Sequence, residues 1–171
     1  MKYMIISDIH GGIYDLNTVL DIYCNEKCDK LIVLGDLFNY GIDLNRKDII
    51  NRLNFMKENI IYVKGNCDSN TDDLLFETPF MKEININDKK VLLTHGHLYS
   101  NEYLLGSNYD IIIYGHTHVA EIRVEKDKLF INPGSISKPR KGEKSFAIID
   151  KKNITIRNLN NKIIEKKIYN N

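Results

Sequence analysis

The sequence predicts an α/β protein in which parallel strands come first and antiparallel strands follow. In the first part of the chain, short β-branched runs alternate with stretches whose apolar residues recur every three or four positions, which is typical of strands followed by helices. In the last third, strands alternate with short polar turns, which is typical of hairpins. A length of 171 residues, 43% of them hydrophobic, suffices for one domain with a buried core, and we expect residues 1–171 to form it.

The first elements follow a strand-then-helix order. Strands are expected at 3–6, 31–34 and 60–63. A helix over 15–27 is predicted because one helical face collects Leu16, Val19, Leu20, Tyr23 and Cys24. Asn45 and Asp48 have the spacing of a capping box, so a second helix is expected to begin there, with Ile49, Ile50, Leu53 and Met56 on its buried face. Residues 72–76 favour a helical turn that ends before Pro79.

The later elements are mostly hairpins. Residues 83–86 and 91–94 are expected to pair across a turn at 87–90, and residues 120–125 and 128–132 across a turn at 126–127. A short helix is expected at 100–105, and a buried strand is expected at 111–113. The last three strands are expected at 145–149, 154–158 and 162–169.

Composition excludes several classes of partner. The formal net charge is +1, and no basic stripe or aromatic platform is present, so we expect no nucleic acid or membrane partner. The apolar N-terminal run is interrupted at Asp8 and His10, too early for a secretory leader or a membrane span. Three cysteines are too few for a disulfide framework, so the chain is expected to be cytoplasmic.

Polar side chains that can bind metals follow five of the expected strands. They are Asp8, His10, Asp36, Asn66, His95, His116 and His118. Because ligands of open α/β sheets bind outside the carboxyl ends of the strands, we expect these side chains to converge. Carboxylate, imidazole and amide ligands together suit Mn²⁺, Fe²⁺ or Zn²⁺ better than Ca²⁺.

Seven ligands are too many for one ion, since no position would remain open for a substrate. Two ions about 3.5–4 Å apart, bridged by a carboxylate, would each keep about four protein ligands. Such a pair lowers the pKa of a shared water toward about 7 and neutralises a phosphoryl group during attack. The sequence therefore predicts a two-metal hydrolase, with attack by a bridging hydroxide.

Five motifs in order carry a resemblance to a known family. They are Asp8-Ile9-His10, Gly35-Asp36, Gly65-Asn66-Cys67-Asp68, His95-Gly96-His97 and Gly115-His116-Thr117-His118. The series resembles the calcineurin-like metallophosphoesterases from residue 3 to about residue 140. The short length, the Gly-Asn-Cys-Asp-Ser string and the Asn-Pro-Gly-Ser loop are most similar to the small YfcE-type phosphodiesterases.

The resemblance implies a four-layer αββα sandwich of two mixed β-sheets flanked by helices. It implies one metal held by Asp8, His10, Asp36 and His118, and another held by Asp36, Asn66, His95 and His116. We expect two divalent transition-metal ions, Mn²⁺ first, with Fe²⁺, Zn²⁺ or Ni²⁺ as alternatives. Catalytic roles are expected for Asp36, Asn66 and His95, and substrate contacts for Asn66, Cys67 and His97. The substrate is expected to be a small phosphate ester, and the resemblance also suggests a homo-oligomer.

One residue departs from the family pattern. Many members carry a histidine where this chain has Cys67, and that histidine is credited with protonating the leaving group or holding the phosphate. Because a thiol is a weak donor, we expect esters with good leaving groups to be hydrolysed better than esters with poor ones. We also expect a stronger preference for diesters over monoesters than in a relative that carries the histidine.

Several alternatives stay open at this point. His97 is as well explained by a structural role as by a substrate contact, and Lys138, Arg140 and Lys141 either hold a substrate phosphate or form a solvated loop. Cys24 and Cys28 are expected to pack rather than to form a redox pair. A phosphomonoesterase or nucleotidase, or a non-catalytic scaffold like the retromer subunit of this fold, remains an alternative to a phosphodiesterase.

Overall fold

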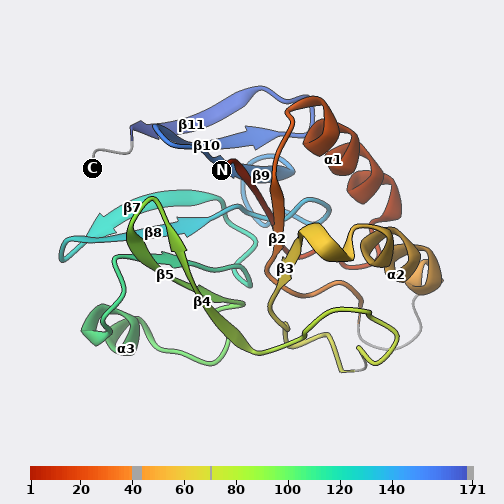
Figure 1. The fold of residues 1–171 in the computed structure, drawn as a ribbon, viewed down its shortest axis with the longest axis horizontal. Coiled ribbons are helices and arrows are strands. Elements are labelled where there is room, and N and C mark those ends of the chain that lie inside the picture. Colours follow the sequence, from red (N-terminus) through yellow and green to blue (C-terminus); the bar gives the residue numbers. More distant parts are fainter. Residues whose placement is uncertain (40–43, 70, 169–171) are drawn as a thin grey trace.

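Two mixed β-sheets stack face to face in the computed structural model, which describes residues 1–39, 44–69 and 71–168 (Figure 1). The larger sheet has the strand order β11-β10-β9-β1-β2-β3. Its members are β1 (Tyr3–Ile6), β2 (Lys30–Val33), β3 (Ile60–Tyr62), β9 (Ser145–Ile149), β10 (Asn153–Asn158) and β11 (Ile163–Ile168). The strands β1, β2 and β3 are parallel, and β9 joins β1 in antiparallel register.

The smaller sheet has the strand order β4-β5-β6-β8-β7. Its members are β4 (Met81–Ile86), β5 (Lys89–Thr94), β6 (Ile111–Ile113), β7 (Glu121–Glu125) and β8 (Lys128–Asn132). The central strands β5, β6 and β8 are parallel, and the edge strands β4 and β7 are antiparallel. Each sheet therefore has three parallel strands whose carboxyl ends lie together.

Helices cover both outer faces, so the expected four-layer order is confirmed. Figure 1 shows α1 (Ile13–Asn25) and α2 (Arg46–Phe55) together on one side and α3 (Asn101–Gly106) on the opposite side. A 3₁₀ turn, η1 (Lys57–Asn59), leads into β3. None of the described helices has the length and apolar character that crossing a membrane requires.

The alternation of strand residues divides the core into layers. On β1, Met4 and Ile6 pack toward α1 and α2, whereas Ile5 packs between the two sheets against residues such as Leu93 and Ile113. A third cluster joins Leu92, Ile112 and Phe130 of the smaller sheet to Leu104 of α3. Because both faces of the central strands are buried, their sequences are continuously apolar rather than alternating.

Several sequence expectations were wrong in detail. Residues 72–76 form a turn without a helix. Asn45 precedes α2 but makes no side-chain cap, and its Nδ2 donates to Gly11 O, 34 positions earlier. Cys24 is exposed, and Ile22 takes its expected place on the buried face of α1. The last strand was expected to reach Tyr169, which lies outside the described residues.

Candidate metal centre

The candidate metal centre lies at the carboxyl ends of the parallel strands of both sheets. Asp8 and His10 follow β1, Asp36 follows β2, and Asn66 follows β3. From the smaller sheet, His95 follows β5, and His116 and His118 follow β6. A hydrogen bond between His95 Nδ1 and Leu34 O, 2.6 Å long, links the strand ends of the two sheets.

Three histidines turn the same ring nitrogen toward the carboxylates. The Nδ1 atoms of His10, His95 and His118 face the backbone oxygens of Phe38, Leu34 and Lys138 at 3.2, 2.6 and 2.6 Å. A carbonyl oxygen only accepts, so this network assigns the proton to Nδ1 and leaves a lone pair on each Nε2. This tautomer, with Nδ1 held by a carbonyl, is typical of histidines that bind metals.

The Nε2 lone pairs gather around two carboxylates. Asp8 Oδ1 lies 3.2 Å from His118 Nε2 and 3.8 Å from His10 Nε2, and the ligand atoms of these three residues lie within 4.8 Å of one another. Asp36 Oδ2 lies 3.4 Å from His95 Nε2 and 3.6 Å from His10 Nε2. The Asp36 carboxylate therefore lies between His10, which also neighbours Asp8, and His95. This is the position expected for a carboxylate that bridges two ions.

Two features show that these residues fit a cation. The Nε2 atoms of His10 and His118 lie 3.2 Å apart, and the tautomers above direct two lone pairs at each other, which is unfavourable without a cation nearby. Asp8 Oδ1 is buried and makes no hydrogen bond to any residue in the described part of the chain. A buried carboxylate oxygen without a donor is costly, and a metal ion would satisfy it.

Asn66 and His116 extend this arrangement toward a second ion. Asn66 Oδ1 lies 3.1 Å from His95 Nε2, which brings the amide oxygen to the Asp36 side. The His116 ring lies 5.2 Å from the His95 ring, centre to centre, and its backbone N–H donates to Asp8 Oδ2 at 3.1 Å. All seven expected residues thus lie in one region.

Backbone strain is concentrated at the same residues. Asp8, His10, Asp36, His116 and His118 all have positive φ, between 43° and 67°. Non-glycine residues seldom adopt this conformation, and it persists only where the surrounding structure enforces it. Here it lets side chains that are close in sequence turn into one site.

Charge and burial shift the pKa values of the central pair. Burial would raise the pKa of Asp36, but a proton on His95 Nε2, which faces this carboxylate, would donate to it and pair with its charge, and this holds the pKa of Asp36 well below its usual range; a metal ion would take the place of that proton. Burial would lower the pKa of His95, but Asp36 and Asp8 raise it. The surroundings of Asp36 and His95 therefore stabilise a positive charge beside the ionised carboxylates.

Asp68 is a supporting residue to which the sequence analysis gave no role. It is fully buried and accepts hydrogen bonds from Asp36 N, Leu37 N, Gly65 N and Tyr62 Oη at 2.7–2.9 Å. These bonds fix the turn that presents Asp36. Its position two residues after Asn66, within a recognised motif, was the available sequence signal.

The loop that follows β8 also supports the centre. Ser135 Oγ donates to Asp8 O at 2.7 Å, and Asn132 Nδ2 donates to Gly115 O at 2.9 Å. Both acceptors belong to ligand-bearing turns that are distant in sequence. The Asn-Pro-Gly-Ser string, which the sequence showed as a closing loop, therefore holds two of these turns in place.

The expected substrate-contact residues differ in their surroundings. Cys67 is 7% exposed, its N–H donates to Asp36 Oδ1 at 2.8 Å, and its sulfur lies within 4.8 Å of ligand atoms of His10 and Asp36. His97 lies next to His95, with the two rings 5.3 Å apart, and its buried Nδ1 has no hydrogen-bond partner among the residues that the structure describes. Cys67 thus lies in the centre, whereas His97 lies beside it.

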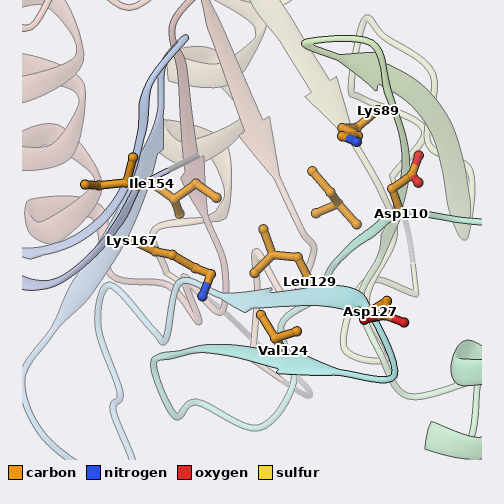
Figure 2. A pocket seen from close by; sticks show the side chains of 9 residues that line it. Lys89, Asp110, Val124, Asp127, Leu129, Ile154 and Lys167 are labelled. Atoms are coloured by element: carbon orange, nitrogen blue, oxygen red, sulfur yellow. The ribbon is translucent and has the colours of Figure 1, made fainter. Parts of the chain in front are cut away.

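A shallow pocket of about 270 Å³ opens over the centre. It is lined by His10, Asp36, Asn39, Asn66, Cys67, His116, His118, Lys138 and Arg140. A different pocket, shown in Figure 2, lies near the amino ends of β5, β6 and β8, where Lys89, Asp110 and Leu129 line it. None of the five histidines lines that second pocket, so we assign the chemistry to the first.

The fold and this centre define a class of protein, a hydrolase that uses a pair of divalent metals. The calcineurin-like phosphoesterase superfamily domain matches residues 1–153. The chain belongs to this superfamily, whose members use a divalent metal pair. The expectations of a metallophosphoesterase fold and of a phosphoesterase are confirmed.

Sequence and structure comparisons with the phosphodiesterase YfcE agree with membership in this superfamily. The chain is 32% identical to the phosphodiesterase YfcE of Escherichia coli over 175 residues, covering 96% of this chain and 95% of that one. The solved structure of YfcE superposes with a TM-score of 0.91 at 31% identity, covering 99% and 100% of the two chains.

One further relative and one structure of the same fold extend the comparison. The chain is 32% identical to the probable metallophosphoesterase YsnB of Bacillus subtilis, covering 90% and 86% of the two chains. Zinc-bound Vps29 of Entamoeba histolytica shares the fold, with a TM-score of 0.69 at 23% identity and coverage of 99% and 100%.

Proposed function

We propose that the protein is a metal-dependent phosphodiesterase that hydrolyses a small phosphate ester. The observation that carries the proposal is the convergence of three histidine Nε2 lone pairs on the carboxylates of Asp8 and Asp36. The sequence identity to YfcE, itself named a phosphodiesterase, supports diesters over monoesters.

The residues fit two divalent ions. One ion would be held by Asp8, His10, Asp36 and His118, and the other by Asp36, Asn66, His95 and His116. When bound, such a pair supplies Lewis acidity and brings the pKa of water toward neutrality. Mn²⁺ is our first expectation, because oxygen and imidazole ligands suit it.

The protein's own groups prepare the site for this chemistry. The carbonyls of Leu34, Phe38 and Lys138 hold the three imidazole rings in one tautomer, so ligand lone pairs are preorganised. Asp68 holds the backbone of Asp36 in place. Cys67 borders the pocket, where a relative with histidine would have a stronger proton donor.

Two further inferences accompany the proposal. We infer that residues 1–171 form one domain, since the two sheets share one buried layer. We also infer that the enzyme acts in the cytoplasm, which its three free cysteines favour.

A substitution at the bridging carboxylate tests the proposal. Bis(4-nitrophenyl) phosphate and 4-nitrophenyl phosphate should be compared with Mn²⁺, Mg²⁺, Zn²⁺ and Ni²⁺ in parallel, together with analysis of bound metal. Asp36→Asn should lower both bound metal and diesterase activity, the latter by about a hundredfold or more. Asp127→Asn is the matched control, because Asp127 is exposed in the β7–β8 turn and asparagine tolerates its positive φ.

The outcomes separate the alternatives. Faster hydrolysis of the monoester than of the diester would favour a phosphomonoesterase or nucleotidase. A wild-type protein without bound transition metal, together with undiminished activity in Asp36→Asn, would overturn the proposal of a metalloenzyme.

A further inference from the structure

Two basic side chains border the pocket over the metal centre. Lys138 and Arg140 line it together with the ligand residues, and both are exposed at its mouth. They are the only lysine and arginine that line this pocket within the described ranges. Both come from the loop that follows Ser135.

This loop is attached directly to a ligand histidine. His118 Nδ1 donates to Lys138 O at 2.6 Å, and Arg140 N donates to His118 O at 3.1 Å. Lys138 N also donates to Ser135 Oγ at 2.8 Å. The backbone that carries both cations is therefore fixed relative to the metal centre, unlike that of an ordinary solvated loop.

The ammonium group of Lys138 reaches the opposite wall of the pocket. Its Nζ donates to Asn39 Oδ1, and Asn39 Nδ2 donates to His10 O at 2.9 Å. One hydrogen bond uses only one of the three ammonium donors, so the others remain available for a ligand. Lys138 thus presents its charge across the mouth of the pocket.

Neither cation has an acidic partner within residues 1–39, 44–69 and 71–168. Other lysines of this chain do have one, since Lys82 contacts Glu77 at 2.6 Å and Lys144 contacts Asp15 at 2.7 Å. Two unneutralised cations in one fixed loop favour an anionic ligand.

We propose that Lys138 and Arg140 bind a second anionic group of the substrate, a phosphate or carboxylate attached to the alcohol that is not the leaving group. The inference rests on the proposed phosphodiesterase function and names a substrate class for it. The metals would engage the scissile phosphate, and the two cations would select diesters with a negative group nearby.

Matched diesters test the inference. Four diesters would share 4-nitrophenol as leaving group and differ in the second alcohol, which is neutral (ethyl), cationic (choline), carboxylated (glycolate) or phosphorylated (2-phosphoethyl). An exposed ion pair strengthens binding about two- to fivefold, so two should raise kcat/KM for one of the anionic diesters over the ethyl diester about tenfold. The choline diester should be the poorest, and whether glycolate or 2-phosphoethyl is better distinguishes carboxylate from phosphate.

The control uses a third cation of the same loop. In the Lys138→Gln/Arg140→Gln double variant, the ratio of anionic to neutral kcat/KM should fall to within about twofold of one. Lys141→Gln should keep the wild-type ratio, because Lys141 is exposed but does not line the pocket. A double variant that keeps the ratio, or a wild type without preference for either anionic diester, would overturn the inference.

A binding measurement separates this inference from the proposed function. Equilibrium dialysis of the Mn²⁺-loaded protein would compare 2-phosphoglycolate, which has two anionic groups, with ethyl phosphate, which has one. Tighter binding of 2-phosphoglycolate that is lost in the double variant supports the anion site even if no diester is hydrolysed. Equal binding of the two ligands by the wild type contradicts the site, whatever the hydrolytic activity.

Discussion

Asp68 supports the metal centre without touching it, because its carboxylate accepts four hydrogen bonds around the Asp36 turn. Asp68→Asn replaces one acceptor oxygen by an amide nitrogen, whose hydrogens would point at the backbone N–H groups and the Tyr62 hydroxyl that donate to Asp68. Loss of such a supporting partner typically lowers metal affinity about 10–100-fold, and we expect this range for Mn²⁺ binding.

Metal titration of the folded variant checks this prediction. Asp73→Asn is the control, because Asp73 is exposed in the turn before Leu74. Unchanged affinity in Asp68→Asn, with a normal thermal transition, would show that the Asp36 turn keeps its geometry without this carboxylate.

The Cys67 thiol lines the pocket over the metal centre. This thiol is a weak donor at a position where the family resemblance implies a histidine in many members, so an aryl diester with a good leaving group should be hydrolysed faster than an alkyl monoester. Cys67→His should raise kcat for esters with poor leaving groups relative to the aryl diester. Rates over a series of leaving-group pKa values measure this, with the exposed Cys24→His as control. Equal or higher wild-type activity on the alkyl monoester would contradict the prediction.

The sequence was sufficient to predict the strands but not the cap of the second helix. The strand at 145–149 was located to the residue, because a continuous apolar run marks a strand that is buried on both faces. The turn at 87–90 was expected to have four residues, but Asn87 and Asp88 alone close it, both with positive φ. The Asn45 cap is absent, and the Nδ2 of this side chain donates to Gly11 O, which is distant in sequence. Local patterns do not contain such distant partners.

The turn after β6 depends on a glycine for space rather than for φ. A Cβ at Gly115 would overlap Ser7 Oγ and would lie 3.0 Å from Asp8 Oδ2. Gly115→Ala should therefore push the β1 and β6 turns apart and destabilise the protein by about 1–3 kcal/mol, as overpacking does. Gly106→Ala is the control, since a Cβ there has no neighbour within 4 Å. Urea unfolding of both variants measures the difference, and equal stability of the two would contradict the predicted overlap.

At the scale of the whole molecule, the sequence was enough to name the seven candidate ligands but not what holds them. The ligands were predictable because each lies in the segment that follows a buried strand of a parallel set. The bond from Ser135 to Asp8 spans 127 positions, and no periodicity indicates it. The assignment of individual residues to the two metals remains a prediction.

Glu26 links elements from both ends of the chain. Its carboxylate contacts Lys2, which precedes β1, and accepts from Arg157 Nη1 and Asn161 Nδ2 at 2.8 Å. The hydrogen bond from Asn161, followed by that from Lys2, lowers the pKa of Glu26 from its usual 4.5 to about 2. A lowered folded-state pKa stabilises the protein above the unfolded-state value, and this contribution is lost as pH falls from about 4.5 to about 2.

Glu26→Gln should therefore destabilise the metal-free protein at pH 7 and matter little near pH 2. The full shift would correspond to about 3 kcal/mol, which partial exposure reduces to roughly 1–2 kcal/mol. Urea unfolding of wild type and variant between pH 7 and pH 2 measures the difference, with exposed Glu58→Gln as the control. A constant difference across that range would mean that Glu26 stabilises the protein through packing rather than through its charge, because only the charged form is lost on acidification.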